Sequence, residues 1–224
     1  MSELLRCEQS FEFITRQPLS KYFALIAASF VLLPTFIGVK NFRYQDRDLR
    51  SLSLFLILSA LTELVAIALF FYKINNFPVL HVFTLIEFGF LSFLYSEHIH
   101  KLIPRNFIFT LVIVFTVFSV VNSLFLQSLF TFNTYARGIE FLIILFYAIV
   151  HIYLLNTENS GTLLHMPMFW ITLGIILYYA SSFFAVLMVN LILPQMNLVW
   201  ALHNVFLLLH YLFFAKALWI HPRQ

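Results

Sequence analysis

The sequence predicts an all-α fold: a polytopic membrane protein built as a bundle of seven transmembrane helices. Of its 224 residues, 62% are hydrophobic and only 10% are charged, whereas about 25% of the residues of a soluble domain are charged. The mean hydropathy is +0.92. A helix needs roughly 20 apolar residues to cross about 30 Å of hydrocarbon, and seven runs of the chain reach that length. They lie at about 21–39, 51–72, 77–96, 106–127, 134–155, 167–189 and 197–219.

The connections between these runs are short and rich in turn-forming residues, as in the segments KNFRYQDRDLR, KINNFP and EHIHKLIPRN. None is long enough for a second domain. We therefore expect residues 1–224 to form a single transmembrane domain, with residues 1–18 as a short extramembrane N-terminal segment. That segment lacks the continuous apolar core of a cleavable signal peptide. Cys7 is the one cysteine, so no internal disulfide can form.

The basic residues predict the orientation, because cytoplasmic loops of membrane proteins carry an excess of lysine and arginine. The side of the first, third and fifth connections and the C-terminus holds eight of the 13 basic residues, and the other side holds five. We therefore expect a multi-pass protein of the inner (cytoplasmic) membrane of the cell, with its N-terminus outside and its C-terminus in the cytoplasm. This topology also explains the net charge of +3, so no nucleic-acid partner is expected.

The fifth span carries its polar groups on one face. Side chains advance about 100° per residue on a helix, so the polar residues of this span fall within roughly 80° of arc. They are Asn133, Arg137, Glu140, Tyr147 and His151. Arg137 lies one turn from Glu140, where the two side chains can pair. The bilayer by itself forces polar groups inward, but this set of titratable groups also suggests a binding surface.

The seventh span gives a similar pattern in the segment HNVFLLLHY. His203, Asn204, His210 and Tyr211 share a face about 120° wide. Lys216 lies on the opposite side, where it is expected to face lipid near Trp219. This placement argues against the retinal-binding lysine of microbial rhodopsins, which also lies in a seventh span.

Two carboxylates are expected near mid-membrane, Glu63 in the second span and Glu87 in the third, with His81 on the approach to Glu87. A carboxylate in hydrocarbon has to be protonated, paired or hydrated. We therefore expect a polar cavity that opens outward and narrows inward, with the face from Arg137 to His151 opposite the histidines of the seventh span. The polar groups of the fourth and sixth spans are interpreted as helix-packing contacts. They are Thr116, Ser119, Asn122 and Ser123, and Trp170, Gly174, Tyr178 and Ser181.

No cofactor, metal or catalytic residue is predicted. His203 and His210 lie about 10.5 Å apart along a helix, too far to share one ion, and this spacing departs from the His-x-x-x-His pair of the seven-helix membrane hydrolases that include alkaline ceramidases and adiponectin receptors. A metal assembled from separate helices, for example by His81, Glu87 and His203, stays open. Haem would need facing histidines at equal depth, but no cytochrome motif is present.

The segments LHNVFLLLHYLFFAKALW, HVFTLIEFGFLSFLY and MPMFWITLGIILYYASSFF resemble those of uncharacterised bacterial seven-helix membrane proteins, some of which resemble the membrane input portions of sensor histidine kinases. The resemblance implies signal detection, with the output carried by a separate signalling protein or a homo-oligomer.

The function expected from the sequence is a membrane sensor or signalling component, not an enzyme, that binds a small ligand or a proton in the outward-facing cavity. In this reading Arg137 and Glu140 orient a polar group, while His203 and His210 supply donors whose charge can change near pH 6.5. The full set of candidate binding residues is Arg137, Glu140, His203, Asn204, His210, Tyr147, His151, Glu63, Glu87 and His81. Two alternatives stay open: a membrane-embedded metal-dependent hydrolase, and a proton-coupled transporter that uses Glu63 and Glu87 as carriers.

Overall fold

A computed structural model describes residues 25–158, 163–191 and 196–220, and every regular element among them is a helix. Residues 1–18 and Cys7 lie outside the described residues. Within this part of the chain, seven helical segments are long and apolar enough to cross a membrane, which confirms the predicted all-α seven-helix class. The first runs over Leu25–Tyr44 and contains α3 (Leu32–Asn41) and the 3₁₀ turn η1 (Phe42–Tyr44). The others are α4 (Arg47–Phe71), α5 (Phe77–His98), α6 (Arg105–Val121) with its π-helical turn η2 (Asn122–Leu126), α7 (Thr134–Glu158), α8 (Pro167–Leu191) and α9 (Met196–Ile220).

Local chemistry explains where the first two spans break and begin. α3 begins at Leu32, after a turn at residues 30–31, and Pro34 stands in its first turn. Proline lacks the backbone donor and clashes with the carbonyl four residues earlier, so the break falls where Pro34 requires it. α4 starts at Arg47, four residues before the predicted start, because the Asp46 carboxylate accepts a hydrogen bond from Leu49 N at 2.9 Å. This cap brings Asp48 into the helix.

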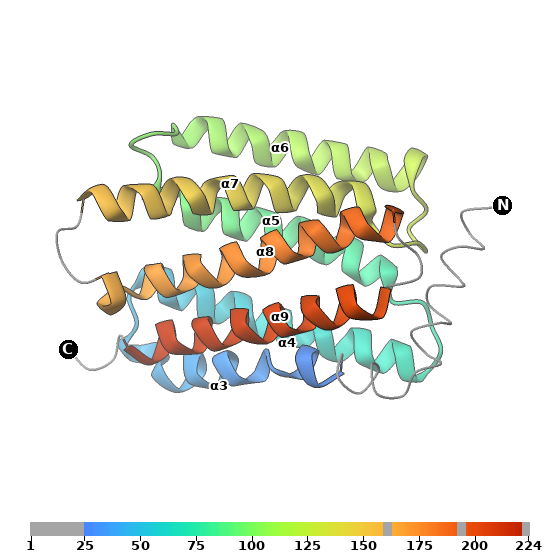
Figure 1. Cartoon of the computed structure of the whole chain (residues 1–224), viewed down its shortest axis with the longest axis horizontal. Coiled ribbons are helices and arrows are strands. Elements are labelled where there is room, and N and C mark those ends of the chain that lie inside the picture. Colours follow the sequence, from blue (N-terminus) through green and yellow to red (C-terminus); the bar gives the residue numbers. More distant parts are fainter. Residues whose placement is uncertain (1–24, 159–162, 192–195, 221–224) are drawn as a thin grey trace.

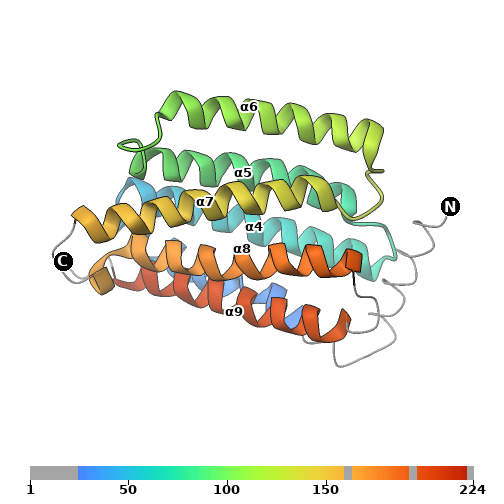
Figure 2. The same ribbon diagram turned by 45° about the horizontal axis from the view of Figure 1, so that its top comes forward.

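Six helices form a closed ring in the order α3, α4, α5, α7, α8, α9, in which each helix packs on the next and α9 returns to α3. α6 packs mainly on α5, outside this ring. Figures 1 and 2 both show α6 along one edge of the bundle, while α8 and α9 run side by side. The interior that can hold a site is therefore enclosed by the ring.

α6 is attached to the ring by aromatic packing and by hydrogen bonds near its end. The rings of Phe88 on α5 and Phe115 on α6 have centroids 4.1 Å apart. At η2, Asn122 Nδ2 donates to Asn133 Oδ1 at 3.2 Å. Asn122 thus packs as interpreted, whereas Thr116 is exposed and donates to Val112 O of its own helix.

A close approach of two helices occurs at Gly38, which is buried on α3. Its carbonyl accepts from Gln45 Nε2 at 3.2 Å, and Gln45 Oε1 accepts from Ser53 Oγ at 2.8 Å. A Cβ at Gly38 would lie 2.6 Å from Ser53 Oγ. Since a contact this short forces Ser53 to move, α3 and α4 pack at their present distance only with glycine here.

We expect Gly38→Ala to lower the melting temperature of the purified protein, because the added methyl overpacks a buried contact at a cost of about 1–3 kcal/mol. Gly89→Ala on α5 is the matched control, because a Cβ there would meet no atom within 4 Å. Thermal unfolding in detergent measures both variants. An unchanged or higher melting temperature for Gly38→Ala would contradict the close approach.

Candidate functional site

A central cavity of about 210 Å³ lies between α4, α5, α7, α8 and α9. At roughly 30 Å³ per molecule this space suits several waters or one small ligand. Phe132, in the connection before α7, also lines it, so the cavity reaches toward the end of the bundle that carries connections 72–76 and 127–133, called here the 72–76 end. Its polar lining consists of Ser59, Thr62, Glu63, Glu87, Arg137, Tyr178, Ser182, His203, His210 and Tyr211.

One arginine and two carboxylates form the charged centre of the site. Arg137 Nη1 donates to Glu87 Oε2 and, at 2.8 Å, to Glu140 Oε2. The remaining oxygen of Glu87, Oε1, accepts from Tyr179 OH at 2.9 Å. The side chains of Arg137, Glu87 and Glu140 are 15%, 11% and 0% exposed. The positive charge of Arg137 is therefore balanced by carboxylates of the protein itself, and no anionic ligand is needed to balance it.

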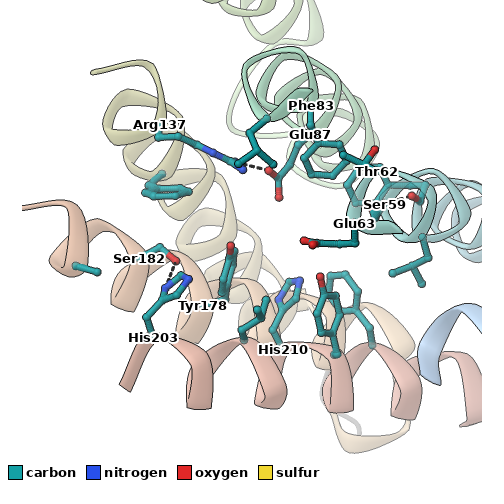
Figure 3. Close-up of a pocket in the computed structure, with 18 of the residues that line it drawn as sticks. Ser59, Thr62, Glu63, Phe83, Glu87, Arg137, Tyr178, Ser182, His203 and His210 are labelled. Carbon is teal, nitrogen blue, oxygen red and sulfur yellow. Dashed lines mark hydrogen bonds and ion pairs between the residues drawn. The ribbon is translucent and has the colours of Figure 1, made fainter. Parts of the chain in front are cut away.

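Glu63, on α4, is the second carboxylate that lines the cavity besides Glu87, and Glu140 lies behind Arg137. Figure 3 shows Glu63 and Glu87 pointing from different helices into the same space, with His210 on another wall. When all three carboxylates are ionised, they place three negative charges around the single positive charge of Arg137. The cavity is therefore suited to a cationic ligand rather than to an anionic one.

The wall formed by α8 and α9 supplies imidazole and phenol groups. His203 Nδ1 and Ser182 Oγ lie 3.2 Å apart, within hydrogen-bonding distance. The ring of His210 packs between those of Tyr178, with centroids 4.9 Å apart, and Phe214, with centroids 4.1 Å apart. Gly174 lets the two helices approach closely, since a Cβ there would lie 3.3 Å from His210 O.

The structure divides the predicted binding residues into groups. Glu63, Glu87, Arg137, His203 and His210 line the cavity. Glu140 is not among the lining residues and lies buried behind Arg137. Asn204 is also absent from the lining of this cavity.

His81 is turned away from the cavity toward α6. Its Nδ1 lies 3.1 Å from Ser123 Oγ, and its Nε2 lies 3.0 Å from Thr131 O. The three-residue metal site formed with Glu87 and His203 is therefore wrong, because both ring nitrogens of His81 are engaged elsewhere. In the described residues, no three histidine, cysteine, aspartate or glutamate side chains are grouped to hold a metal.

Tyr147 and His151 belong to a second polar cluster, farther along α7. His151 Nδ1 lies 2.7 Å from Thr172 Oγ1 on α8, and Tyr95 OH donates to the same oxygen at 3.4 Å. The ring centroids of Tyr95 and Tyr147 are 6.3 Å apart. The predicted face of the fifth span thus does not stand as one wall opposite the seventh span, since only Arg137 among its candidates reaches the central cavity.

Sequence reasoning missed several residues of both clusters. Tyr178 was interpreted as helix packing, yet it lines the cavity. Tyr179 bonds to Glu87, and Asp48 contacts His98 at 2.9 Å in a segment predicted to be a connection. Helical spacing could have identified two of the missed residues, because Thr172 and Tyr179 lie seven residues apart and therefore share a helix face.

Lys216 is exposed on α9, as expected for a residue that faces lipid. Its ammonium lies 3.6 Å from the ring centroid of Trp170 on α8, which makes Trp170 a cation–π partner.

No family model, curated protein or solved structure matches this chain.

Proposed function

We propose that this protein is an integral membrane sensor or signalling component that binds a small organic cation in the central cavity. One observation carries the proposal: Arg137 is paired with both Glu87 and Glu140, while Glu63 brings a further carboxylate to the same space. An anionic ligand would have to break one of these buried pairs. A cation would instead balance the excess negative charge.

The apolar lining also suits an ammonium group. The aromatic rings of Phe55, Phe83 and Tyr178 line the cavity beside Glu63 and Glu87. Aromatic faces attract cations, and the attraction is strongest where water is excluded. The volume of about 210 Å³ fits a ligand of a few heavy atoms, such as a methylated amine, better than a peptide or a lipid.

The resemblance to membrane input portions of sensor kinases supports the sensor role. The cavity is bounded by helices that also reach both ends of the bundle, so a ligand that draws Glu63 toward Glu87 would shift α4 against α5. A separate signalling protein or a second copy of the chain would receive this change. In keeping with the distribution of basic residues, we place the protein in the cytoplasmic membrane with the 72–76 end outside.

Thermal unfolding of the purified full chain with choline, ethanolamine or methylammonium chloride tests the proposal at constant ionic strength. At ten times its Kd a ligand stabilises the folded state by about 1.4 kcal/mol, which corresponds to a rise of about 3–6 °C for a chain of this size. We expect a saturable rise with at least one amine, and no rise with sodium acetate.

Glu63→Gln should abolish that rise, because it removes the carboxylate that has no ion-pair partner among the described residues and keeps the shape of the side chain. Glu97→Gln is the matched control. Glu97 undergoes the same chemical change outside the cavity, where it pairs with Arg105 at 2.7 Å. The proposal fails if no amine raises the melting temperature, if acetate acts equally, or if Glu63→Gln responds like the wild type.

A further inference from the structure

Several of the buried polar groups of α5, α7 and α8 form two layers along the bundle. The upper layer, the one closer to the 72–76 end, holds Glu87, Glu140 and Tyr179, one from each helix. The lower layer holds Tyr95 on α5, Tyr147 and His151 on α7, and Thr172 on α8. On α7 the distance from Glu140 to His151 is about 16.5 Å along the axis. The two layers together therefore cover about half of the hydrocarbon thickness.

The lower layer continues to the opposite end of the bundle. The ring centroids of His151 and His98 are 5.2 Å apart, and His98 Nε2 lies 2.9 Å from Asp48 Oδ2. The side chains of His98 and Asp48 are 25% and 30% exposed, so this pair connects the buried layer with the exterior. Among the described residues, the ionisable groups beside His151 are therefore Tyr95 and His98 on α5 and Tyr147 on α7, and Asp48 on α4 lies next to His98.

Three polar atoms on α7 are buried without a hydrogen-bond partner among the described residues. They are Glu140 Oε1, Tyr147 OH and His151 Nε2, and their residues are at most 2% exposed. Because they recur at intervals of seven and four residues, they lie on one helix face. Buried polar atoms of this kind are usually satisfied by internal water. A row of such atoms on one face indicates a path along which water can bind inside the bundle.

Three apolar side chains lie between the two polar layers, one on each helix. These side chains, called here the apolar layer, are Leu91 on α5, Ile144 on α7 and Ile175 on α8, all buried in the same hydrophobic core. Each lies one turn from the Glu87, Glu140 or Tyr179 of its own helix, on the same face. A dry apolar layer between two polar ones blocks water until it is hydrated, which is how hydrophobic constrictions gate channels.

We infer that the two layers form a gated proton pathway from Glu140, which lies behind Arg137 at the central cavity, to the Asp48 and His98 pair. When Glu140 is protonated and the apolar layer is hydrated, the proton passes from its carboxyl to water, to Tyr147 and His151, and then to His98, whose Nε2 lies 2.9 Å from Asp48 Oδ2. The Glu140 carboxylate then takes up the next proton from water on the side of the central cavity. Each step breaks one bond to hydrogen and forms another on a neighbouring oxygen or nitrogen. Neither Tyr147 nor His151 lines the central cavity, so this route suits protons and not the larger ligand proposed above.

Reconstitution of the full chain in liposomes tests the pathway. Liposomes loaded with potassium and the pH dye pyranine are diluted into low potassium with valinomycin, so that the potential draws protons inward. We expect wild-type liposomes to acidify faster than protein-free ones. Tyr147→Phe and His151→Phe should lose this flux, since each removes one carrier of the proton. Ile144→Ala should raise it, because a smaller side chain admits water to the apolar layer.

Two controls undergo the same chemical changes on the outer face of α7. Tyr153→Phe and Ile149→Ala alter side chains that are 60% and 54% exposed, and both should conduct like the wild type. Tyr147→Phe removes only a hydroxyl that has no partner among the described residues, so the melting temperature of this variant should not fall. Measuring that temperature distinguishes a loss of proton flux from a loss of folding.

Two results would overturn the inference. One is acidification by wild-type and Ile144→Ala liposomes at the protein-free rate. The other is equal flux in Tyr147→Phe and Tyr153→Phe. The amine-induced rise in melting temperature is measured separately, so a failure of the pathway is distinguishable from a failure of the proposed cation site.

Discussion

Arg137→Met lowers the free energy of unfolding by about 3–5 kcal/mol, the largest loss expected of any single charged residue here. The substitution removes the only partner of Glu140 Oε2 among the described hydrogen bonds and one of the two partners of Glu87. Two carboxylates are then left close together in a buried site without a balancing charge. Unfolding of the purified protein in detergent, measured by heat or by added sodium dodecyl sulfate, gives the difference.

Replacing Glu87 and Glu140 together with Arg137 shows whether the stability is lost through the unbalanced charges or through the missing arginine side chain. The triple variant Arg137→Met, Glu87→Gln, Glu140→Gln should regain most of the lost stability, because no unpaired charge is left in the bundle. Arg105→Met is the control, since Arg105 pairs with Glu97 at the surface and such pairs contribute about 0–1 kcal/mol. If the triple variant is no more stable than Arg137→Met, the buried ion pairs are not what makes Arg137 important.

Phe88→Ala is expected to cost about 3–5 kcal/mol, as for a large side chain truncated in a packed interior. Phe88 is fully buried on α5, and its ring packs on Phe115 of α6. Because α6 lies outside the ring of six helices, this contact is a main part of what holds it. The cavity left by Phe88→Ala should therefore loosen α6 and lower the melting temperature.

Phe107→Ala provides the comparison, because Phe107 lies on α6 and its side chain is exposed. In a bilayer an exposed phenylalanine contacts lipid, and its loss leaves no internal cavity. We expect this variant to keep its melting temperature within the range of ordinary surface substitutions, about 0.5 kcal/mol. Equal losses for Phe88→Ala and Phe107→Ala would contradict the packing of α6 on α5.

The sequence was sufficient to predict the seven membrane spans and many of the side chains that point into the bundle. The length of the apolar runs predicts seven membrane helices, because the hydrocarbon thickness fixes the number of residues needed. Helical spacing also predicts that Glu140, Tyr147 and His151 share a face, and all three are buried. The bilayer gives polar side chains no alternative to the interior, so their inward direction can be inferred without any homologous structure.

The predicted starts of helices were less accurate where a polar cap extended a span beyond its apolar run. α4 begins at Arg47 because Asp46 caps it, so Asp48 is a helical residue beside His98 rather than part of a connection. A hydropathy pattern predicts the apolar part of a helix but not the polar residues that its N-cap adds at the start. The Asp48 and His98 pair at the lower end of the proposed pathway was missed for this reason.

What the sequence determined by itself is the set of helices and the inward face of each, since these depend on hydrophobicity and on spacing along one helix. Which faces meet was decided only by the tertiary structure. Arg137 is joined to Glu87, 50 residues away, while His81 turns to the connection before α7, and Glu140 and His151 fall into separate layers. Pairing between helices depends on their order around the ring and on close approaches such as that at Gly174. Spacing along a single helix carries no information about either.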